Sequence, residues 1–170
     1  GENSNASAAG TQNETATVQD ESADSNTDST DSTTSLVQDN RVLQIPDDNY
    51  RTYYELFVYS FYDSDGDGIG DLQGVLEKLD YLNDGDDTTD MDLGINGIWL
   101  MPVMPSVTYH KYDTTDYENI DPQYGTLETF QELLTACHDR GIRVILDLAM
   151  NHSSSSHPWF QQAAEYLKSL

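Results

Sequence analysis

The strongest constraint on the fold is the order of apolar segments along the chain after residue 40. Three apolar runs have the composition of strands, and each is followed by a stretch in which apolar residues recur at helical spacing. The runs are almost continuously apolar, which is typical of parallel strands covered on both faces. The alternation therefore predicts either a doubly wound sheet or a (β/α)8 barrel. The predicted strands are residues 53–61, 95–101 and 143–148, and the predicted helices are residues 71–83, 126–140 and 158–170.

Residues at the ends of the predicted helices support these boundaries. Thr126 has a side chain suited to cap a helix amino terminus, and Gly141 is a natural stop after the second helix. Pro158 suits the first turn of the third helix, with Ser156 or His157 near its cap.

The loops favour the barrel over the doubly wound sheet. No glycine-rich phosphate-binding pattern follows any predicted strand, whereas the segment from Pro102 to Gly125 is long and rich in Tyr, His and Asp. Barrel enzymes build their sites from such loops at the carboxyl ends of their strands. A complete barrel needs about 250 residues. We therefore expect the first three βα units of a (β/α)8 TIM barrel, from a larger protein.

The composition changes near residue 40. Residues 1–40 contain no Lys, Arg or aromatic residue and are rich in Ser, Thr and Asp. Such a segment buries too little apolar area to offset its ordering entropy. The sequence predicts a disordered acidic Ser/Thr-rich spacer at 1–40 and a folded domain at 41–170. The spacer suits an extracellular or cell-surface-tethered protein, and a plain flexible terminus is the alternative.

The charge excludes several classes of function. The chain has 31 acidic and 7 basic residues and a net charge of −24, which argues against binding to nucleic acid or to anionic lipid. No apolar run approaches the roughly 20 residues of a membrane-spanning helix. The single cysteine, Cys137, allows no internal disulfide.

A candidate metal site follows the first predicted strand. Acidic residues alternate with small residues in DSDGDGIGD, residues 63–71. This pattern matches the first half of an EF-hand loop, but Gly74 stands where the bidentate glutamate would be, and a strand rather than a helix precedes the loop. The sequence predicts a calcium loop of similar local geometry, and an acidic surface turn is the alternative. The predicted ligands are Asp63, Asp65, Asp67, the Ile69 carbonyl and Asp71.

Two further stretches carry chemistry. Asp147 interrupts the third apolar run, and Asn151 and His152 follow on the next loop. An acid inside an apolar strand is costly unless it is paired, so Asp147 is either a satisfied structural residue or part of a site. Residues 109–117, YHKYDTTDY, interleave aromatic rings with carboxylates. A sugar needs such a surface, because its C–H face stacks on rings and its hydroxyls find acceptors.

Together these stretches resemble the α-amylase family, glycoside hydrolase family 13. DSDGDGIGD, GINGIWLMP, YHKYDTTDY, DPQYGT and GIRVILDLAMNH occur in the family's order and cover residues from about 53 to 160. The insertion at residues 83–87 and the HPWF stretch look like the secreted bacterial α-amylases near the oligo-1,6-glucosidases. The resemblance implies a (β/α)8 barrel with a small domain inserted after the third strand.

The resemblance also implies roles for single residues. Asp147 matches the Asp that orients the site beneath the nucleophile, His152 the His that hydrogen-bonds the sugar before the scissile bond, and Tyr112 the Tyr that stacks on that sugar. Asn151 matches a residue that binds a different, domain-bridging calcium in many amylases. His110 is also expected to bind substrate. It and Tyr112 flank Lys111, where the family often has glycine, and this lysine is expected to reach over the cleft or point to solvent.

The catalytic residues implied by the resemblance lie beyond this chain. The family hydrolyses α-glucosidic bonds with retention, and its nucleophile, its acid and a stabilising Asp follow later strands. The expected activity is hydrolysis of α-1,4-glucans such as starch and maltodextrin by an enzyme that includes the remainder of the barrel. The chain alone is expected to be inactive.

Three alternatives stay open. One is a related α-glucosidase or transglycosylase of the same family. Another is an inactive member that only binds glycan. The third is a calcium-dependent binding module, which would show a second copy of the calcium motif, whereas the chain has one.

Overall fold

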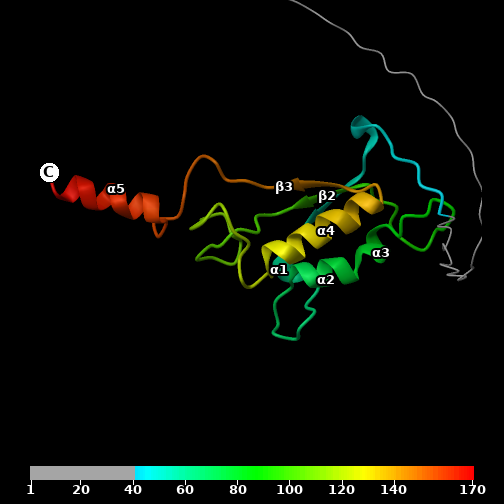
Figure 1. Ribbon diagram of the computed structural model, residues 1–170, viewed down its shortest axis with the longest axis horizontal. Coiled ribbons are helices and arrows are strands. Elements are labelled where there is room, and N and C mark those ends of the chain that lie inside the picture. Colours follow the sequence, from blue (N-terminus) through cyan, green and yellow to red (C-terminus); the bar gives the residue numbers. More distant parts are fainter. Residues whose placement is uncertain (1–40) are drawn as a thin grey trace, which may run out of the picture. The chain divides into compact units, whose positions relative to one another are not determined.

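The computed structural model describes residues 41–170, so the predicted spacer at 1–40 lies outside the described residues. The described part contains a sheet of three parallel strands in the order β1-β2-β3, with helices between the strands (Figure 1). This confirms the predicted alternation. The strands are β1 (Tyr53–Leu56), β2 (Gly97–Leu100) and β3 (Arg143–Leu146). The helices are a 3₁₀ turn (Asp48–Tyr50), α1 (Val58–Phe61), α2 (Leu72–Glu77), α3 (Leu79–Leu82), α4 (Leu127–Asp139) and α5 (Pro158–Lys168).

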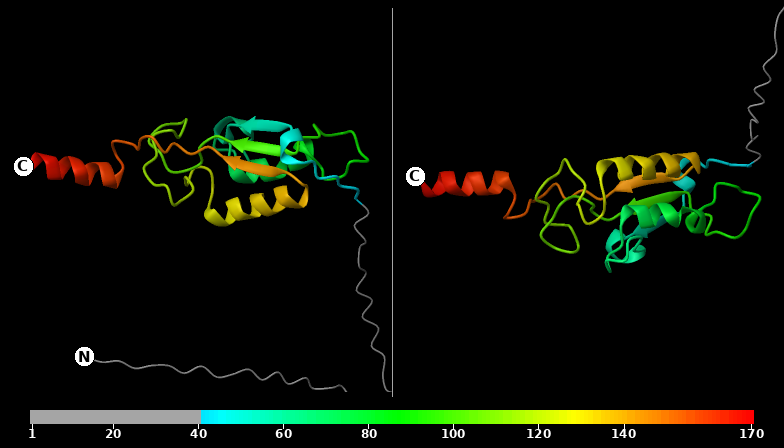
Figure 2. Two further views of the ribbon diagram at one scale, coloured as in Figure 1. Left: turned by 90° about the horizontal axis from the view of Figure 1, so that it is seen from above. Right: turned by 60° about the horizontal axis from the view of Figure 1, so that its bottom comes forward.

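The helices α2 and α4 cover one face of the sheet (Figure 2). Ile98 in the central strand faces them and is 1% exposed, and Leu133 and Cys137 of α4 join the same core. On the opposite face, Glu55, Trp99 and Ile145 form one row across the three strands. Trp99 and Ile145 are 43% and 45% exposed. Both faces of the sheet were expected to be covered. Among the described residues, only the face that packs against α2 and α4 is covered. The other face is the one that points into the interior of a closed barrel.

Every predicted element is shorter than expected, and two of them also change in kind or continuity. The first strand ends at Leu56, and the apolar run continues as the helical turn α1. A continuous apolar run does not distinguish a buried strand from a buried helical turn. The helix expected at 71–83 divides into α2 and α3 at Lys78, whose backbone (φ −107°, ψ 8°) departs from helical values. Apolar spacing continues through the break, because both segments bury the same face.

The expected helix ends are confirmed. The Thr126 side chain accepts a hydrogen bond from the Thr129 amide at the start of α4. Gly141 has φ +70°, a left-handed conformation that often ends a helix. Glycine adopts it without steric strain because it has no Cβ. His157 caps α5 by accepting from the Trp159 amide.

Arg51 fastens the amino-terminal side of the sheet. Its side chain is 2% exposed. One of its nitrogens, Nη1, donates to the carbonyl oxygens of Asn96 (2.7 Å) and Gly141 (2.9 Å), which precede β2 and β3. The buried guanidinium of Arg51, which lies just before β1, is thus hydrogen-bonded to the backbone just before β2 and just before β3.

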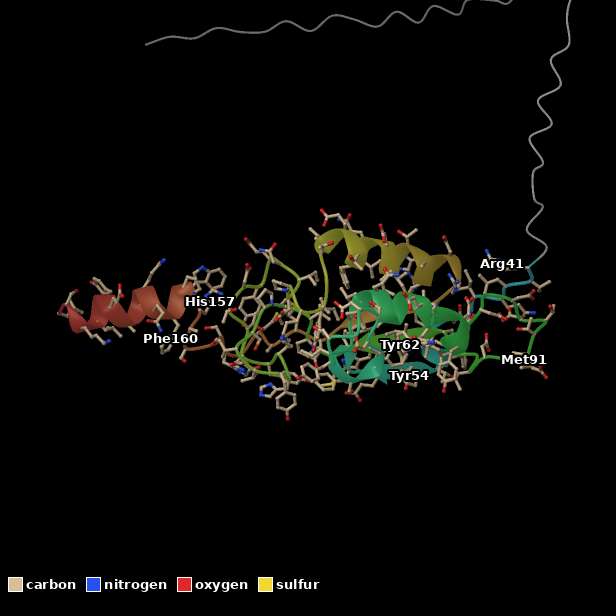
Figure 3. All side chains as sticks on the ribbon, turned by 90° about the horizontal axis from the view of Figure 1, so that it is seen from below. Arg41, Tyr54, Tyr62, Met91, His157 and Phe160 are labelled. Atoms are coloured by element: carbon tan, nitrogen blue, oxygen red, sulfur yellow. The ribbon has the colours of Figure 1, made fainter. Side chains whose placement is uncertain are left out.

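The acidic segment at residues 83–92, which begins with the insertion at residues 83–87, and the start of α5 lie at opposite ends of the described domain. Figure 3 labels Met91 in this segment and His157 and Phe160 at α5. The segment precedes β2, so it lies on the amino-terminal side of the sheet, away from the loops that follow the strands. Among residues 41–170, no helix combines the length and the apolar character needed to cross a membrane.

Candidate active site and metal-binding loop

Asp147 and Tyr112 meet at the carboxyl end of β3. Asp147 is one residue past the strand and two residues past Ile145, so it lies on the same side as the inward row. The Tyr112 hydroxyl, on the long loop after β2, donates to Asp147 Oδ2 at 2.6 Å. Both side chains are half-buried. The carboxylate inside the apolar run is therefore paired, and the two predicted site residues are brought together across 35 positions of sequence.

The hydrogen bond to Asp147 raises the pKa of Tyr112 to about 12, with burial and the carboxylate of Glu55 adding to the effect. The phenol therefore stays protonated throughout the physiological range and remains a donor to Asp147. A neutral ring held by its hydroxyl presents its faces in a fixed orientation, which is what stacking on a sugar requires.

His152 joins this pair from the loop after β3. Its Nε2 lies 2.9 Å from the Tyr112 carbonyl oxygen, and its Nδ1 lies 2.6 Å from the side-chain nitrogen Nδ2 of Asn151. A carbonyl oxygen only accepts, so Nε2 carries the proton and Nδ1 accepts from Asn151. Both ring nitrogens thus have protein partners. The predicted neighbours Tyr112, Asp147 and His152 form one cluster, and a direct hydrogen bond from His152 to a sugar requires its ring to exchange a partner.

His110 also lies beside Tyr112. Its Nδ1 accepts from the Tyr112 amide at 3.2 Å and contacts the Thr108 hydroxyl at 3.2 Å. Its ring centroid lies 5.9 Å from that of Tyr112 and 5.3 Å from that of Tyr109. Since Nδ1 is an acceptor, the proton is on Nε2, which leaves a donor on the half-buried ring.

Lys111 does not reach over the cleft or point to solvent as expected. Its side chain is 1% exposed, and its Nζ donates to Asp121 at 2.6 Å and to Gln123 at 2.7 Å. Its φ is +64°, a left-handed conformation that costs a residue with a side chain roughly 1–2 kcal/mol. The lysine at this position thus puts strain in the backbone and an ion pair beneath the loop.

Tyr117 was not among the predicted site residues. Its hydroxyl donates to the carbonyl oxygens of His152 (2.7 Å) and Ala149 (3.0 Å), which fixes the loop that carries His152. Tyr117 and Trp159 also line a pocket of about 440 Å³ with Leu148, Met150, His152 and Ser153. The signal in the sequence was Tyr117 itself, the last residue of YHKYDTTDY. The pattern alone does not show whether its ring faces a sugar or holds the loop in place.

The predicted metal loop folds around three carboxylates. Asp63, Asp65 and Asp71 each offer an oxygen, and these atoms all lie within 4.8 Å of one another. The amides of Gly68 and Gly66 hydrogen-bond to Asp63 and lower its pKa. Gly66 and Gly68 both have positive φ, so the glycines of the motif make the turn. Three clustered oxygen donors of like charge suit a hard divalent cation.

The other two predicted ligands of the loop are Asp67 and the Ile69 carbonyl. Asp67 is outside this cluster, and its Oδ1 accepts from the Ile69 amide at 2.7 Å. Asp71 has a second role, because its Oδ1 caps α2 by accepting from the Gly74 amide at 2.6 Å. The Ile69 carbonyl and Asn151 stay predicted as ligands.

Packing explains why the twelfth position of the motif is glycine. Gly74 is buried in α2, and a Cβ there would lie 2.1 Å from the carbonyl oxygen of Tyr62, which Figure 3 labels. No side chain fits at position 74 without moving the backbone. The loop therefore lacks the bidentate glutamate of an EF-hand for a steric reason.

Comparisons with known proteins agree with this geometry. The family described as "Alpha amylase, catalytic domain" matches residues 55–169. Alpha-amylase 3 of Dictyoglomus thermophilum is 52% identical over 112 residues, which cover 66% of this chain and 21% of that protein. "Probable oligo-1,6-glucosidase 2" of Bacillus subtilis is 41% identical over 111 residues, which cover 65% of this chain and 18% of that protein.

A solved structure shows the same arrangement of elements. The crystal structure of the α-amylase from H. orenii superposes with a TM-score of 0.67 at 65% sequence identity and covers 68% of this chain and 24% of that one. The chain thus spans about a fifth to a quarter of the length of these relatives. Its strands correspond to the first part of their barrels.

Proposed function

Because the chain belongs to the α-amylase family, glycoside hydrolase family 13, we propose that the complete enzyme hydrolyses α-1,4-glucosidic bonds in starch and maltodextrin. The complete enzyme is the protein that carries this chain together with the remaining strands of the barrel. The observation that supports this proposal most is the convergence of Tyr112, Asp147 and His152 at the carboxyl end of β3. A barrel strand end with a held aromatic ring above a carboxylate is suited to a sugar ring.

The proposed reaction is a double displacement with retention of configuration. It uses two carboxylates about 5–5.5 Å apart and passes through an oxocarbenium-like transition state. The resemblance assigns both carboxylates to later strands, so this chain's residues position the substrate. Tyr112 offers a ring face, and Asp147 places its carboxylate at the floor of the site, where positive charge develops on the sugar. Contacts that strengthen in the transition state raise kcat rather than only lowering KM.

The rest of the barrel is the partner that the proposal requires. Trp99 and Ile145, in the row that faces away from the helices, are 43% and 45% exposed. Their apolar area would be buried by further strands, at about 25 cal/mol per Å². We propose that closure of the barrel covers this face and brings the catalytic carboxylates to the cluster around Asp147.

The substrate class is tested with paired oligosaccharides. We expect the complete enzyme to release reducing sugar from maltoheptaose and from soluble starch. We expect it to leave cellohexaose intact, because the proposed site binds α-linked and not β-linked glucose. Cleavage of cellohexaose, or inactivity on every α-glucan, would contradict the proposal.

The alternative activities within the family are separated by the same assay. An α-glucosidase would cleave maltose and isomaltose faster than starch, and a transglycosylase would lengthen oligosaccharides instead of releasing reducing ends. The match to the relative from Bacillus subtilis named above keeps the glucosidase as a candidate.

We also propose an extracellular or cell-surface location, which rests only on the composition of residues 1–40.

We further propose calcium as the ion of the loop at residues 63–71. The donor set fits, since Asp63, Asp65 and Asp71 offer carboxylate oxygens within 4.8 Å of one another and the loop has no softer ligand type. When bound, the ion would neutralise the three acids and stabilise the loop at the start of α2. The loop lies beside α2, so this role is structural.

Removal of the ion provides the test. Asp65→Ala in the complete enzyme should abolish the rise in melting temperature that calcium gives over a chelator, because mass action gives about 3 kcal/mol at a hundredfold excess over the dissociation constant. Asp67→Ala should leave most of this rise, since Asp67 lies outside the cluster. Asp90→Ala, which removes an exposed acid of the segment at residues 83–92, is the matched control. A wild-type melting temperature that ignores the chelator would contradict the calcium assignment.

A further inference from the structure

Lys111 has a backbone conformation unlike that of any other non-glycine residue in the described part of the chain. It alone among them has a positive φ, +64°. It stands between His110 and Tyr112, and the Lys111 amide donates to the Thr108 carbonyl oxygen at 3.3 Å to close the turn. The left-handed residue is therefore at the point where the loop reverses its direction.

The Lys111 side chain is buried beneath this turn. Its Nζ lies 2.6 Å from Asp121 Oδ2 and 2.7 Å from Gln123 Oε1, and it lies 5.0 Å from the centroid of the Tyr124 ring. Asp121 is 4% exposed. A buried ammonium with a carboxylate, an amide oxygen and a ring face around it is fully accounted for, so it is not available to a ligand.

Asp121 joins the two ends of the loop that carries Tyr112. Its Oδ2 accepts from the Ser106 amide at 3.3 Å, and its Oδ1 accepts from the Gln123 amide at 2.9 Å. Its own amide donates to the Val103 carbonyl oxygen, directly after β2. The ion pair thus ties the tip of the loop, at Lys111, to its base.

The turn decides where the neighbouring side chains lie. Because Lys111 is buried beneath the loop, the preceding and following residues, His110 and Tyr112, lie on its more open side and are half-buried. From that side the Tyr112 hydroxyl reaches Asp147 and the Tyr112 carbonyl meets His152. A change of φ at position 111 would rotate the following peptide and move Tyr112 from both contacts.

We propose that Lys111 is a positioning residue of the sugar site, whose buried ion pair with Asp121 holds a left-handed turn that directs Tyr112 to Asp147. The proposal rests on the proposed function only for what Tyr112 contacts. The lysine acts through Tyr112 and touches no substrate. Its role is to compensate the strain of φ +64°, which a glycine at the same position would not incur.

Two replacements of Lys111 separate the turn from the charge. Lys111→Met keeps a long side chain and the backbone strain but loses the ion pair, so we expect kcat/KM on maltoheptaose to fall about 10- to 100-fold, mainly in kcat. Lys111→Gly also loses the ion pair but adopts positive φ freely, and water can enter the vacated volume beside Asp121. We therefore expect Lys111→Gly to stay within about fivefold of wild type.

A second background tests whether the lysine acts through Tyr112. In Tyr112→Ala, Lys111→Met should change kcat/KM by less than about threefold, because the group that it positions is gone. Lys78→Met is the matched control, since Lys78 lies between α2 and α3 and its Nζ stands 4.0 Å from the centroid of the Tyr62 ring. All rates are measured well below each variant's melting temperature.

The proposal would be overturned if Lys111→Met kept wild-type kcat/KM and only melted earlier, if Lys111→Gly lost as much as Lys111→Met, or if the loss persisted in Tyr112→Ala. Hydrogen exchange gives a readout that does not need activity. The amides of residues 106–115 should exchange faster in Lys111→Met than in wild type or Lys78→Met, and unchanged exchange contradicts the proposal. An enzyme inactive on all α-glucans with this exchange pattern would refute the proposed function alone.

Discussion

Asp147→Asn in the complete enzyme should lower kcat/KM on maltoheptaose by more than about 1000-fold, equivalent to about 4 kcal/mol of transition-state stabilisation. The substitution keeps the shape of the side chain and removes its charge. Asp147 accepts the Tyr112 hydroxyl at 2.6 Å at the floor of the proposed site. An amide there loses the negative charge beneath a sugar that becomes positive, and its NH₂ group can turn toward the Tyr112 hydroxyl, which would then lack an acceptor.

The control separates this effect from a general loss of charge. Asp139→Asn changes an exposed carboxylate at the end of α4 and should leave kcat/KM within about twofold of wild type, as is usual for surface substitutions. The melting temperature of Asp147→Asn should fall only slightly, because the residue is half-buried and lies outside the core. Near-normal turnover in Asp147→Asn would show that this carboxylate is structural.

Tyr112→Ala should lower kcat/KM by about 10- to 1000-fold, or about 1.4–4 kcal/mol, with most of the loss in kcat. The ring face, the hydrogen bond to Asp147 and the contact with His110 all disappear together. Tyr112→Phe is the matched variant, since it keeps the ring and loses the hydroxyl. We expect it to lie between wild type and Tyr112→Ala, because the ring remains but is no longer held.

His152→Ala should fall in the same range with folding nearly intact, since His152 is exposed on a loop. Its loss also frees the Tyr112 carbonyl oxygen from Nε2. Rates and KM values on a short soluble maltooligosaccharide, with melting temperatures as the folding check, measure both variants. Wild-type rates in either His152→Ala or Tyr112→Ala would place the chemistry elsewhere.

The fold was largely predictable because its local signals agree with one another. Apolar runs, helical spacing and the caps at Thr126 and His157 all point to the same βα alternation, and the structure confirms the parallel order. The ends of the elements were less predictable. The turn α1 continues an apolar run that looks like a strand, and the break at Lys78 leaves the apolar spacing unchanged.

The structure brings three of the predicted site residues together, but their contacts were not predictable from the sequence. Motif order suggested Tyr112, Asp147 and His152, and the topology places them together. The burial of the Lys111 side chain could not be predicted from the sequence. It depends on an ion pair with Asp121, which follows ten residues later and lies beneath the turn. The same holds for Gly74, whose missing side chain reflects the Tyr62 carbonyl packed against α2. These contacts arise between segments, so spacing within one segment does not reveal them.

The anomeric form of the first product tests the account most directly. Proton NMR of maltoheptaose during cleavage by the complete enzyme should show the α-anomer of the new reducing end first, with the β-anomer appearing later by mutarotation, because a double displacement retains configuration. Cleavage that releases the β-anomer first, or no cleavage of the α-linked chain, would contradict the account of Tyr112, Asp147 and His152 as the sugar-positioning part of a retaining α-glucan hydrolase.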